Sequence, residues 1–214
     1  MLDWTPPDPL RAVPLTGRHV VLEPLRVDHA EDLHAAVAGP GTSWEFLPVA
    51  APADVAATRA LVETHLADPG METVVVRPGG GAVAGRISWI RQVPADGCAE
   101  VAWVVLGPSV RRTTAATEAV HLLLRQAFGA GYRRVEWKCD AANAPSRRAA
   151  LRLGFTAEGV FRQHKVVKGR NRDTAGFAVT DADWRVVRPA HEAWLDPANH
   201  DADGRQRTPL RVDR

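Results

Sequence analysis

The chain has 214 residues, of which 45% are hydrophobic, 27 are Lys or Arg and 25 are Asp or Glu. This length and apolar content fit one domain with a sizeable core, and a net charge of only +2 argues against a protein that coats nucleic acid. The two cysteines are too few for a disulfide framework, and no apolar run is long enough to span a membrane.

The two ends of the chain differ in composition from the middle. Residues 1–16 contain four prolines and predict an extended arm. This arm lacks the basic and apolar layout of a secretion signal, so we expect the protein in the reducing cytoplasm. A single domain is predicted over residues 17–183, and residues 184–214 are predicted to form a partly irregular C-terminal extension.

The first half of the domain predicts helices followed by a β-meander. A strand is expected over 19–23, a helix over 28–37 with Asp28 as its N-cap, and a second helix over 52–66. Three segments rich in Val, Ile and Trp follow, over 73–77, 82–92 and 100–106. Because turns that contain Pro and Gly separate them, they predict antiparallel strands.

The second half alternates helices and strands. Apolar residues at helical spacing predict the clearest helix over 114–128, and the following elements are a strand over 135–139, a helix over 146–153, and strands over 155–168 and 172–180. Because a strand, a helix and a strand follow one another through residues 101–139, the two strands should form a parallel or splayed pair. The sequence thus predicts an α/β (α+β) domain with a mixed sheet.

Two segments indicate a phosphate-bearing cofactor. Before the clearest helix, two cations precede a run of small residues: Arg111, Arg112, Thr113, Thr114, Ala115 and Ala116. The start of a helix has unpaired N–H groups and a positive dipole end, and small side chains let a pyrophosphate approach the backbone. About thirty residues later Asn143-Ala144-Pro145-Ser146 opens the short helix, which Leu153-Gly154-Phe155 closes. Together the segments favour an acyl-coenzyme A site.

This order of elements, with these two segments, resembles the GNAT superfamily of acyl-coenzyme A N-acyltransferases, specifically its RimJ/RimL-like branch of ribosomal-protein N-terminal acetyltransferases. The resemblance covers residues 17–183 and implies a mostly antiparallel seven-stranded sheet with a splayed parallel pair at the cofactor site. It implies acetyl-CoA as co-substrate and a primary amine, on a small molecule or a peptide N-terminus, as acceptor. Where the family's phosphate loop usually has glycine the chain has Thr114, whose β-carbon narrows the approach.

The resemblance also implies catalytic roles for Glu100 and Ser146. Glu100 begins a predicted strand where this branch often has the carboxylate proposed as general base for the amine. Many members protonate the leaving sulfur with a tyrosine, but that position is Ala150 here, so Ser146 is the expected donor. Two alternatives stay open: Glu100 is a solvated residue after a turn, and Ser146 only caps a helix.

Further cofactor contacts are expected from Trp103, Val104, Val105, Asn143, Ser146 and Arg147. The Asn143 amide can both donate to and accept from the pantetheine arm, or it can act as an N-cap. Arg147 and Arg148 can reach the adenosine phosphates, or one of them can belong to a solvated helix face. A backbone N–H within residues 103–106 is expected to bind the oxyanion of the tetrahedral intermediate.

The acceptor side is expected to include Trp44, Glu45, Trp89 and Trp137. Tryptophans can stack on a cationic or flat acceptor, and Glu45 can pair with an ammonium, although each of these residues can equally belong to the core or the surface. The histidines and cysteines lack ligand spacing, so no metal is expected.

Two other functions stay open. Thr114 and Ala150, at the glycine and tyrosine positions of the family, would also suit a non-catalytic acyl-CoA-binding protein. The basic clusters Arg111-Arg112, Arg147-Arg148 and 165–172 would suit a ribosome- or RNA-associated module, which the near-neutral net charge disfavours. Membrane partners are not expected, and either a monomer or a homodimer fits.

Overall fold

One eight-stranded sheet runs through the computed structural model, which describes residues 2–39 and 43–212. Its strand order is β1-β2-β3-β4-β5-β6-β8-β7. The strands are β1 (Leu15–Thr16), β2 (Val20–Pro24), β3 (Glu72–Pro78), β4 (Gly85–Val93), β5 (Cys98–Leu106), β6 (Arg134–Asp140), β7 (Thr156–Val167) and β8 (Arg170–Thr180).

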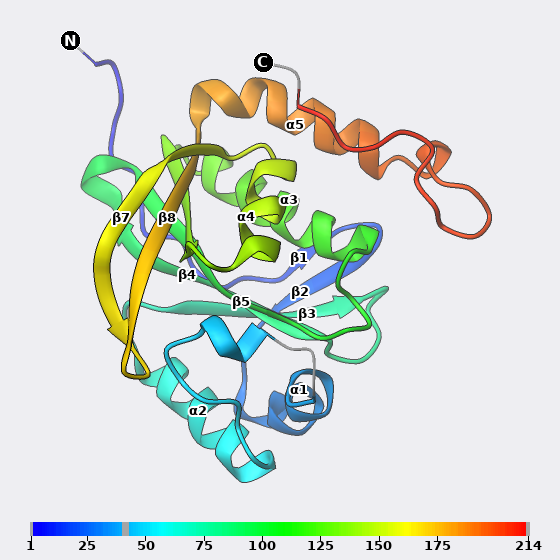
Figure 1. The fold of residues 1–214 in the computed structure, drawn as a ribbon. Coiled ribbons are helices and arrows are strands. Elements are labelled where there is room, and N and C mark those ends of the chain that lie inside the picture. Colours follow the sequence, from blue (N-terminus) through cyan, green and yellow to red (C-terminus); the bar gives the residue numbers. More distant parts are fainter. Residues whose placement is uncertain (1, 40–42, 213–214) are drawn as a thin grey trace.

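Helices cover both faces of the sheet. They are α1 (Ala30–Val37), α2 (Val55–Ala67), α3 (Thr114–Gly129), α4 (Ala144–Arg152) and α5 (Asp181–Leu195). Short 3-10 turns are η1 (Val27–His29), η2 (Ser43–Phe46), η3 (Pro94–Asp96) and η4 (Pro197–Asn199). Figure 1 shows α1 and α2 on one face of the sheet and α3, α4 and α5 on the other. In the described part of the chain, no helix is both long and apolar enough to cross a membrane.

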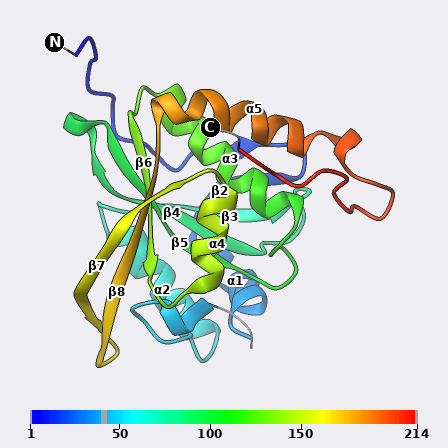
Figure 2. The same ribbon diagram turned by 45° about the horizontal axis from the view of Figure 1, so that its top comes forward.

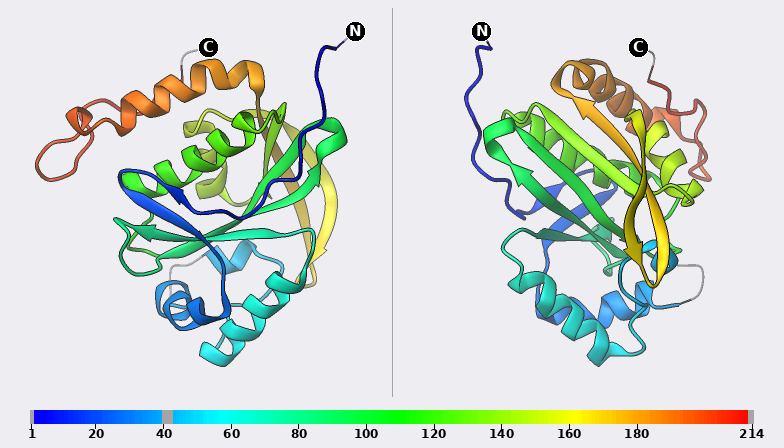
Figure 3. Two further views of the ribbon diagram at one scale, coloured as in Figure 1. Left: turned by 180° about the vertical axis from the view of Figure 1, so that it is seen from behind. Right: turned by 60° about the vertical axis from the view of Figure 1, so that its left-hand side comes forward.

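The predicted mixed, mostly antiparallel sheet is confirmed, with one strand more than the seven expected. The additional strand is β1, two residues at the end of the N-terminal arm that pair with β2 at Leu15↔Leu22 and Thr16↔Val21. The arm itself runs along the side of the sheet that carries α3 (Figure 3, left). Leu10 is buried there, and Gln126 of α3 donates to the Arg11 carbonyl at 2.8 Å.

The predicted parallel pair is also confirmed. Strands β5 and β6 are paired from Cys98↔Arg134 to Val101↔Trp137, and both then continue without pairing to each other. The crossover helix α3 joins them across one face, so its apolar side packs on Ala99 and Val101 of β5. The unpaired ends of β5 and β6 therefore form a split in the sheet.

The start of α1 differs from the prediction. Asp28 is not its N-cap, because residues 27–29 form the 3-10 turn η1 and α1 begins only at Ala30. The Asp28 carboxylate instead pairs with Arg26 at 3.1 Å. Helix α2 does have an acidic N-cap, since Asp54 accepts a hydrogen bond from the Ala57 N–H at 2.7 Å.

Helix α5 was missed by the sequence analysis, and the predicted boundary between residues 183 and 184 falls inside it. Thr180 and Asp183 form a capping box at its start. Its buried side chains, which include Trp184, Val187 and His191, recur at intervals of three and four residues and cover α3. Pro189 inside the helix works against a helical prediction, whereas the packing on α3 stabilises the helix.

The α3–α5 contact contains a pH-sensitive group, His191, which is fully buried. Its Nε2 donates to the Leu153 carbonyl at 3.1 Å, and burial lowers its pKa to about 3 from 6.5. Below pH 6.5 the unfolded chain therefore binds a proton that the folded chain does not, so stability falls as the pH drops toward 3. We expect this loss to reach about 1.4 kcal/mol per pH unit.

The measurement is the free energy of urea unfolding at pH 7 and pH 5, for the wild type and His191→Gln. Glutamine retains a donor for the Leu153 carbonyl but does not titrate. The free energy of unfolding of the His191→Gln variant should therefore fall less steeply than that of the wild type as the pH drops. His164→Gln, at an exposed position, is the matched control. An equal slope in wild type and His191→Gln would show that His191 is not the group responsible.

Candidate functional site

A cleft of about 1370 Å³ opens where β5 and β6 separate. It extends from the residues after η2, past the split in the sheet, to the start of α3, to α4 and to the C-terminal segment. Figure 2 shows α4 lying beside α3 on this side of the sheet, with the C-terminal segment returning past them. The cleft therefore connects the two segments that the sequence analysis singled out.

The start of α3 forms one end of the cleft. Thr113 is the N-cap: its Oγ1 accepts from the Ala116 N–H at 3.4 Å and donates to the Val110 carbonyl at 2.6 Å. By helix geometry, the next N–H groups have no acceptor within the helix and remain available to an anion. Of the six predicted residues, five line the cleft, namely Arg111, Arg112, Thr113, Thr114 and Ala116.

The sixth, Ala115, has a side chain that packs in the core at 5% exposure. Only its backbone N–H faces the loop side, as helix geometry requires at this position. Arg111 is held by a hydrogen bond from its Nε to the Leu106 carbonyl at 2.8 Å, which ties the loop to the end of β5. Partial burial lowers the pKa of this guanidinium.

Asn143 and Ser146 lie together at the start of α4, and both line the cleft. The Asn143 Oδ1 accepts from the Ser146 N–H at 3.0 Å, so Asn143 is the N-cap and its Nδ2 is left to donate elsewhere. Ser146 Oγ accepts from the Trp137 Nε1 at 3.0 Å. Because the indole supplies that hydrogen, the serine O–H remains able to donate to a further group, and Asn143, not Ser146, is the N-cap of α4.

The two consecutive arginines of α4 point in different directions. Arg147 does not line the cleft and donates instead to the Ala141 carbonyl at 3.3 Å. Arg148 lines the cleft, as does Arg152, whose guanidinium lies 4.6 Å from the Trp194 ring centroid and donates to Thr117 Oγ1. Of the predicted pair, Arg148 is thus the cation placed in the cleft.

Glu100 lies on the sheet face opposite α3 and is only 4% exposed. It is therefore not the solvated residue of the alternative interpretation. Its Oε2 contacts Arg91 Nη1 at 2.9 Å and Lys138 Nζ at 3.3 Å. Lys138 lies on the next strand, β6, and also contacts Glu136 of that same strand.

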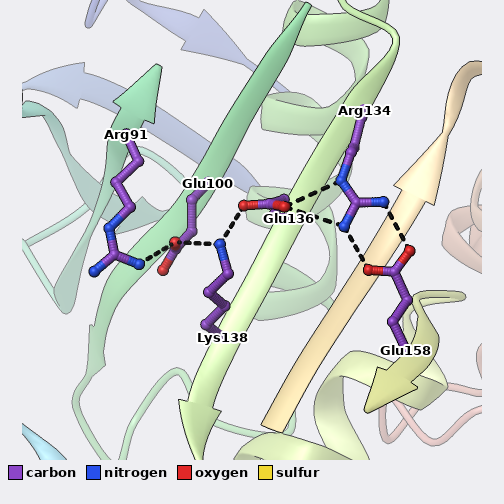
Figure 4. A network of polar contacts seen from close by, with 6 residues as sticks. All are labelled: Arg91, Glu100, Arg134, Glu136, Lys138 and Glu158. Atoms are coloured by element: carbon purple, nitrogen blue, oxygen red, sulfur yellow. Dashed lines mark hydrogen bonds and ion pairs between the residues drawn. The ribbon is translucent and has the colours of Figure 1, made fainter. Parts of the chain in front are cut away.

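The chain of charges continues away from the cleft. Arg134 joins Glu136 to Glu158 of β7, and Figure 4 shows this row of alternating charges running from β4 to β7. Arg91, Glu100 and Lys138 line the cleft, whereas Glu136 does not. Glu100 is thus the carboxylate at which the network meets the cleft, and it is held in place by two cations.

Trp103 occupies a β-bulge at the split. The pairing of β4 with β5 shifts by one residue between Arg86↔Val105 and Ser88↔Ala102, and Trp103 has a positive φ of 49°. Trp103 and Val104 line the cleft. Val105 is fully buried against Trp44 and does not, so only its backbone is available to a ligand.

The buried cation Arg86 lies beneath the Trp103 ring, with its guanidinium carbon 5.2 Å from the ring centroid. His65 of α2 contacts both of these residues, and burial followed by the Arg86 charge lowers its pKa to about 4. One face of the Trp103 indole is therefore already occupied by a cation of the protein itself.

The predicted acceptor residues are divided between the core, the surface and the cleft. Trp89 is 1% exposed, donates to Gln126 of α3 and does not line the cleft; its neighbour Ile90, which points to the opposite face, does. Trp44 is also buried, with its Nε1 donating to the Val37 carbonyl at 2.7 Å, and Glu45 is exposed outside the cleft. Trp137 is the tryptophan of this set that lines the cleft.

Several cleft residues escaped the sequence analysis as site residues. They are Phe46, Leu47, Pro48, Arg91, Lys138, Cys139, Arg152, His164, Lys165, Arg172, Thr174, Trp194, His200, Arg205 and Gln206. The basic cluster at 165–172 was a visible signal in the sequence. A hairpin turn explained it adequately, and an acidic or phosphate-bearing acceptor was the less favoured alternative. Burial raises the pKa of the Cys139 thiol, which opposes a role as nucleophile. Within the described residues, no group of three or more His, Cys, Asp and Glu side chains could hold a metal ion.

The comparisons with known proteins agree with this geometry. Residues 19–156 match the family model of the acetyltransferase (GNAT) domain. A GCN5-related N-acetyltransferase from Brucella melitensis is 40% identical with a TM-score of 0.93, over 97% of this chain and 96% of that chain. A probable acetyltransferase of the GNAT family from Chromobacterium violaceum is 37% identical with a TM-score of 0.82, over 86% of this chain and 94% of that chain.

More distant structures share the fold alone. An acetyltransferase from Salmonella typhimurium that modifies the N-terminal serine of a 50S ribosomal subunit protein is 20% identical, with a TM-score of 0.66 over 77% of this chain and 96% of that chain. A comparison with curated proteins gave no significant match.

Proposed function

This chain belongs to the GNAT acetyltransferase family, and on that premise we propose that it transfers an acetyl group from acetyl-CoA to a primary amine by direct attack within a ternary complex. The observation that carries the proposal is the single cleft that joins the start of α3, the β5–β6 split and Glu100. A ternary complex needs both substrates in one continuous space, with the thioester between them.

The cofactor would lie along the α3 and α4 side of the cleft. The free N–H groups at the start of α3, with Arg111, Arg112 and Arg148, suit the pyrophosphate and the adenosine phosphate. Asn143 Nδ2 would donate to the pantetheine arm, because its Oδ1 is already used as the N-cap. When bound, acetyl-CoA supplies the thioester that is attacked.

The acetyl transfer would use groups on both faces of the split. Glu100, directly or through a water molecule, takes the proton of the amine as the nitrogen bonds to the acetyl carbon. A backbone N–H of the 103–106 segment stabilises the oxyanion, and the C–S bond then breaks. The Ser146 O–H, oriented by Trp137, donates a proton to the departing thiolate and is restored from solvent.

Titration with acetyl-CoA by calorimetry tests the cofactor site, with Asn143→Ala as the comparison variant. Micromolar binding that weakens in the variant, together with amine-dependent release of thiol, would support the proposal. Binding without thiol release for any amine would favour the non-catalytic acyl-CoA-binding protein that Thr114 and Ala150 suggest. Absence of binding would contradict both.

The two cysteines are free thiols, which fits a reducing compartment such as the cytoplasm.

Ser146→Ala should lower kcat by about tenfold, with little change in acetyl-CoA affinity. This is less than the roughly 100- to 10,000-fold range of general acid–base catalysis, because a thiolate is a good leaving group and depends less on protonation. The loss should shrink with an acyl donor whose thiol leaves more easily, because that thiolate needs no proton. Trp137→Phe removes the group that orients the hydroxyl and should give a smaller loss of the same kind. Steady-state rates of thiol release check this expectation. Equal losses with both acyl donors would exclude a role in thiolate protonation.

A further inference from the structure

The acceptor half of the cleft is enclosed by three segments. These are residues 46–48 at the end of η2, the β5–β6 split, and the end of the β7–β8 hairpin. Lys168 at the hairpin turn donates from its Nζ to the Trp44 carbonyl at 2.7 Å, so the hairpin is tied to η2. This half is therefore a bounded pocket whose wall includes Glu100.

Positive charge exceeds negative charge in this pocket. The cations that line it are Arg91, Lys138, Lys165 and Arg172, with His164 beside them. The carboxylates are Glu100 and Asp140. Glu100 is already shared by Arg91 and Lys138, and Asp140 Oδ1 accepts from the Ala142 N–H at 2.8 Å. Across residues 2–39 and 43–212, neither Lys165 nor Arg172 has a carboxylate within ion-pair distance.

Lys165, which is exposed, and Arg172, which is partly buried, are neighbouring cations in this pocket. Lys165 and Arg172 are directly opposite each other in the β7–β8 register, where like charges destabilise a sheet. Burial, followed by the charges of Arg91 and Arg172, lowers the pKa of Lys165. An anion between the two side chains would remove the repulsion and satisfy both.

Two buried polar atoms in the same wall also lack a partner. Thr174, which is 1% exposed, has no hydrogen-bond partner for its Oγ1 among the described residues, and the same holds for Arg172 Nε. Buried polar atoms are normally hydrogen-bonded, so an unsatisfied hydroxyl and an unsatisfied guanidinium N–H in one pocket indicate a missing acceptor atom. Neither atom has a role in the mechanism described above.

We propose that the acceptor carries an anionic group, a carboxylate or a phosphate, close to its primary amine, and that Lys165, Arg172 and Thr174 bind that group. The amine would then face Glu100 while the anion faces the hairpin. The cations would repel an acceptor that carries only an ammonium. This inference rests on the proposed acetyl transfer and specifies its acceptor class.

Matched acceptor pairs test the proposal, with kcat/KM measured from thiol release in the presence of acetyl-CoA. Serine against serinamide and glutamate against glutamine probe a carboxylate, and O-phosphoethanolamine against ethanolamine probes a phosphate. We expect the anionic member of at least one pair to be preferred tenfold or more. In Arg172→Gln and Lys165→Gln, its KM should rise at least tenfold. Arg170→Gln, in the same hairpin but outside the cleft, should leave that KM unchanged.

The outcomes separate this inference from the proposed function. Absence of acetyl-CoA binding in calorimetry would contradict the acetyltransferase proposal itself. If acetyl-CoA binds but the neutral members react as well as the anionic ones, the inference is wrong and the proposed function stands. The same conclusion follows if acetyl-CoA binds and only neutral members react, or if the preference persists in both variants. If acetyl-CoA binds and no member of any pair releases thiol, the inference and the proposed acetyl transfer are both contradicted.

Discussion

Replacing Glu100 with glutamine is expected to lower kcat/KM for the amine by roughly 100- to 1000-fold, within the range for loss of a general base. The loss should be largest at low pH, where nearly all of the amine is protonated and attack requires a base. At high pH the free amine is abundant, so the variant should recover part of its rate. The measurement is the pH–rate profile of both enzymes at saturating acetyl-CoA.

The ion-pair network supplies a matched control for this substitution. Glu136 is the parallel-strand partner of Glu100 and contacts the same lysine, Lys138, but it does not line the cleft. Glu136→Gln removes the same charge from the same network one strand away. If the two variants lose equal activity, the effect comes from the network as a whole and Glu100 is not the base. An unchanged pH–rate profile in Glu100→Gln would exclude it as well.

The second large effect is expected from Thr114→Asp at the start of α3. A negative charge about 5 Å from a phosphate costs about 3 kcal/mol at an effective dielectric constant near 20, so the Kd of acetyl-CoA should rise on the order of 100-fold. The same charge lies at the first position of α3, where it interacts favourably with the helix dipole. Stability should therefore be kept or slightly raised while binding is lost.

Thr114→Asn is the matched control, because asparagine has the size of aspartate without its charge. Its Kd should stay within about threefold of the wild type, as expected for a neutral substitution at a partly exposed position. Calorimetric titration and thermal unfolding of the three proteins give both quantities. If the asparagine variant binds as weakly as the aspartate variant, then the shape of the loop and not its charge limits the approach of the phosphates. Equal affinity in all three would place the phosphates elsewhere.

The elements that the sequence predicted best are those that local patterns specify. The apolar spacing of α3 and the alternation of β6 predicted both elements to within about two residues of the observed bounds. Helix α5 was missed because Pro189 interrupts a pattern whose stabilising partner, α3, is far away in the sequence. Asp28 was assigned to a cap because a short 3-10 turn has no distinctive sequence signal.

In the candidate site, too, local features were predicted from the sequence and features that depend on tertiary packing were not. The residues at the starts of α3 and α4 were recognisable because a helix start and a phosphate-type loop are local features, and these residues lie in the cleft. The orientations of single side chains could not be predicted from the sequence. Arg147 and Arg148 differ by one helical step, and only packing shows that Arg148 points into the cleft.

The sequence by itself therefore determined the family, the mixed sheet with its parallel pair, and the start of α3 as a candidate anion site. Only the tertiary structure decided which tryptophans are core, that Glu100 is buried between Arg91 and Lys138, and that Lys165, Arg172 and Thr174 share a wall with it. The reason is physical. Backbone periodicity and helix capping depend on neighbours in the chain, whereas burial and charge balance depend on side chains that the sheet brings together from distant strands.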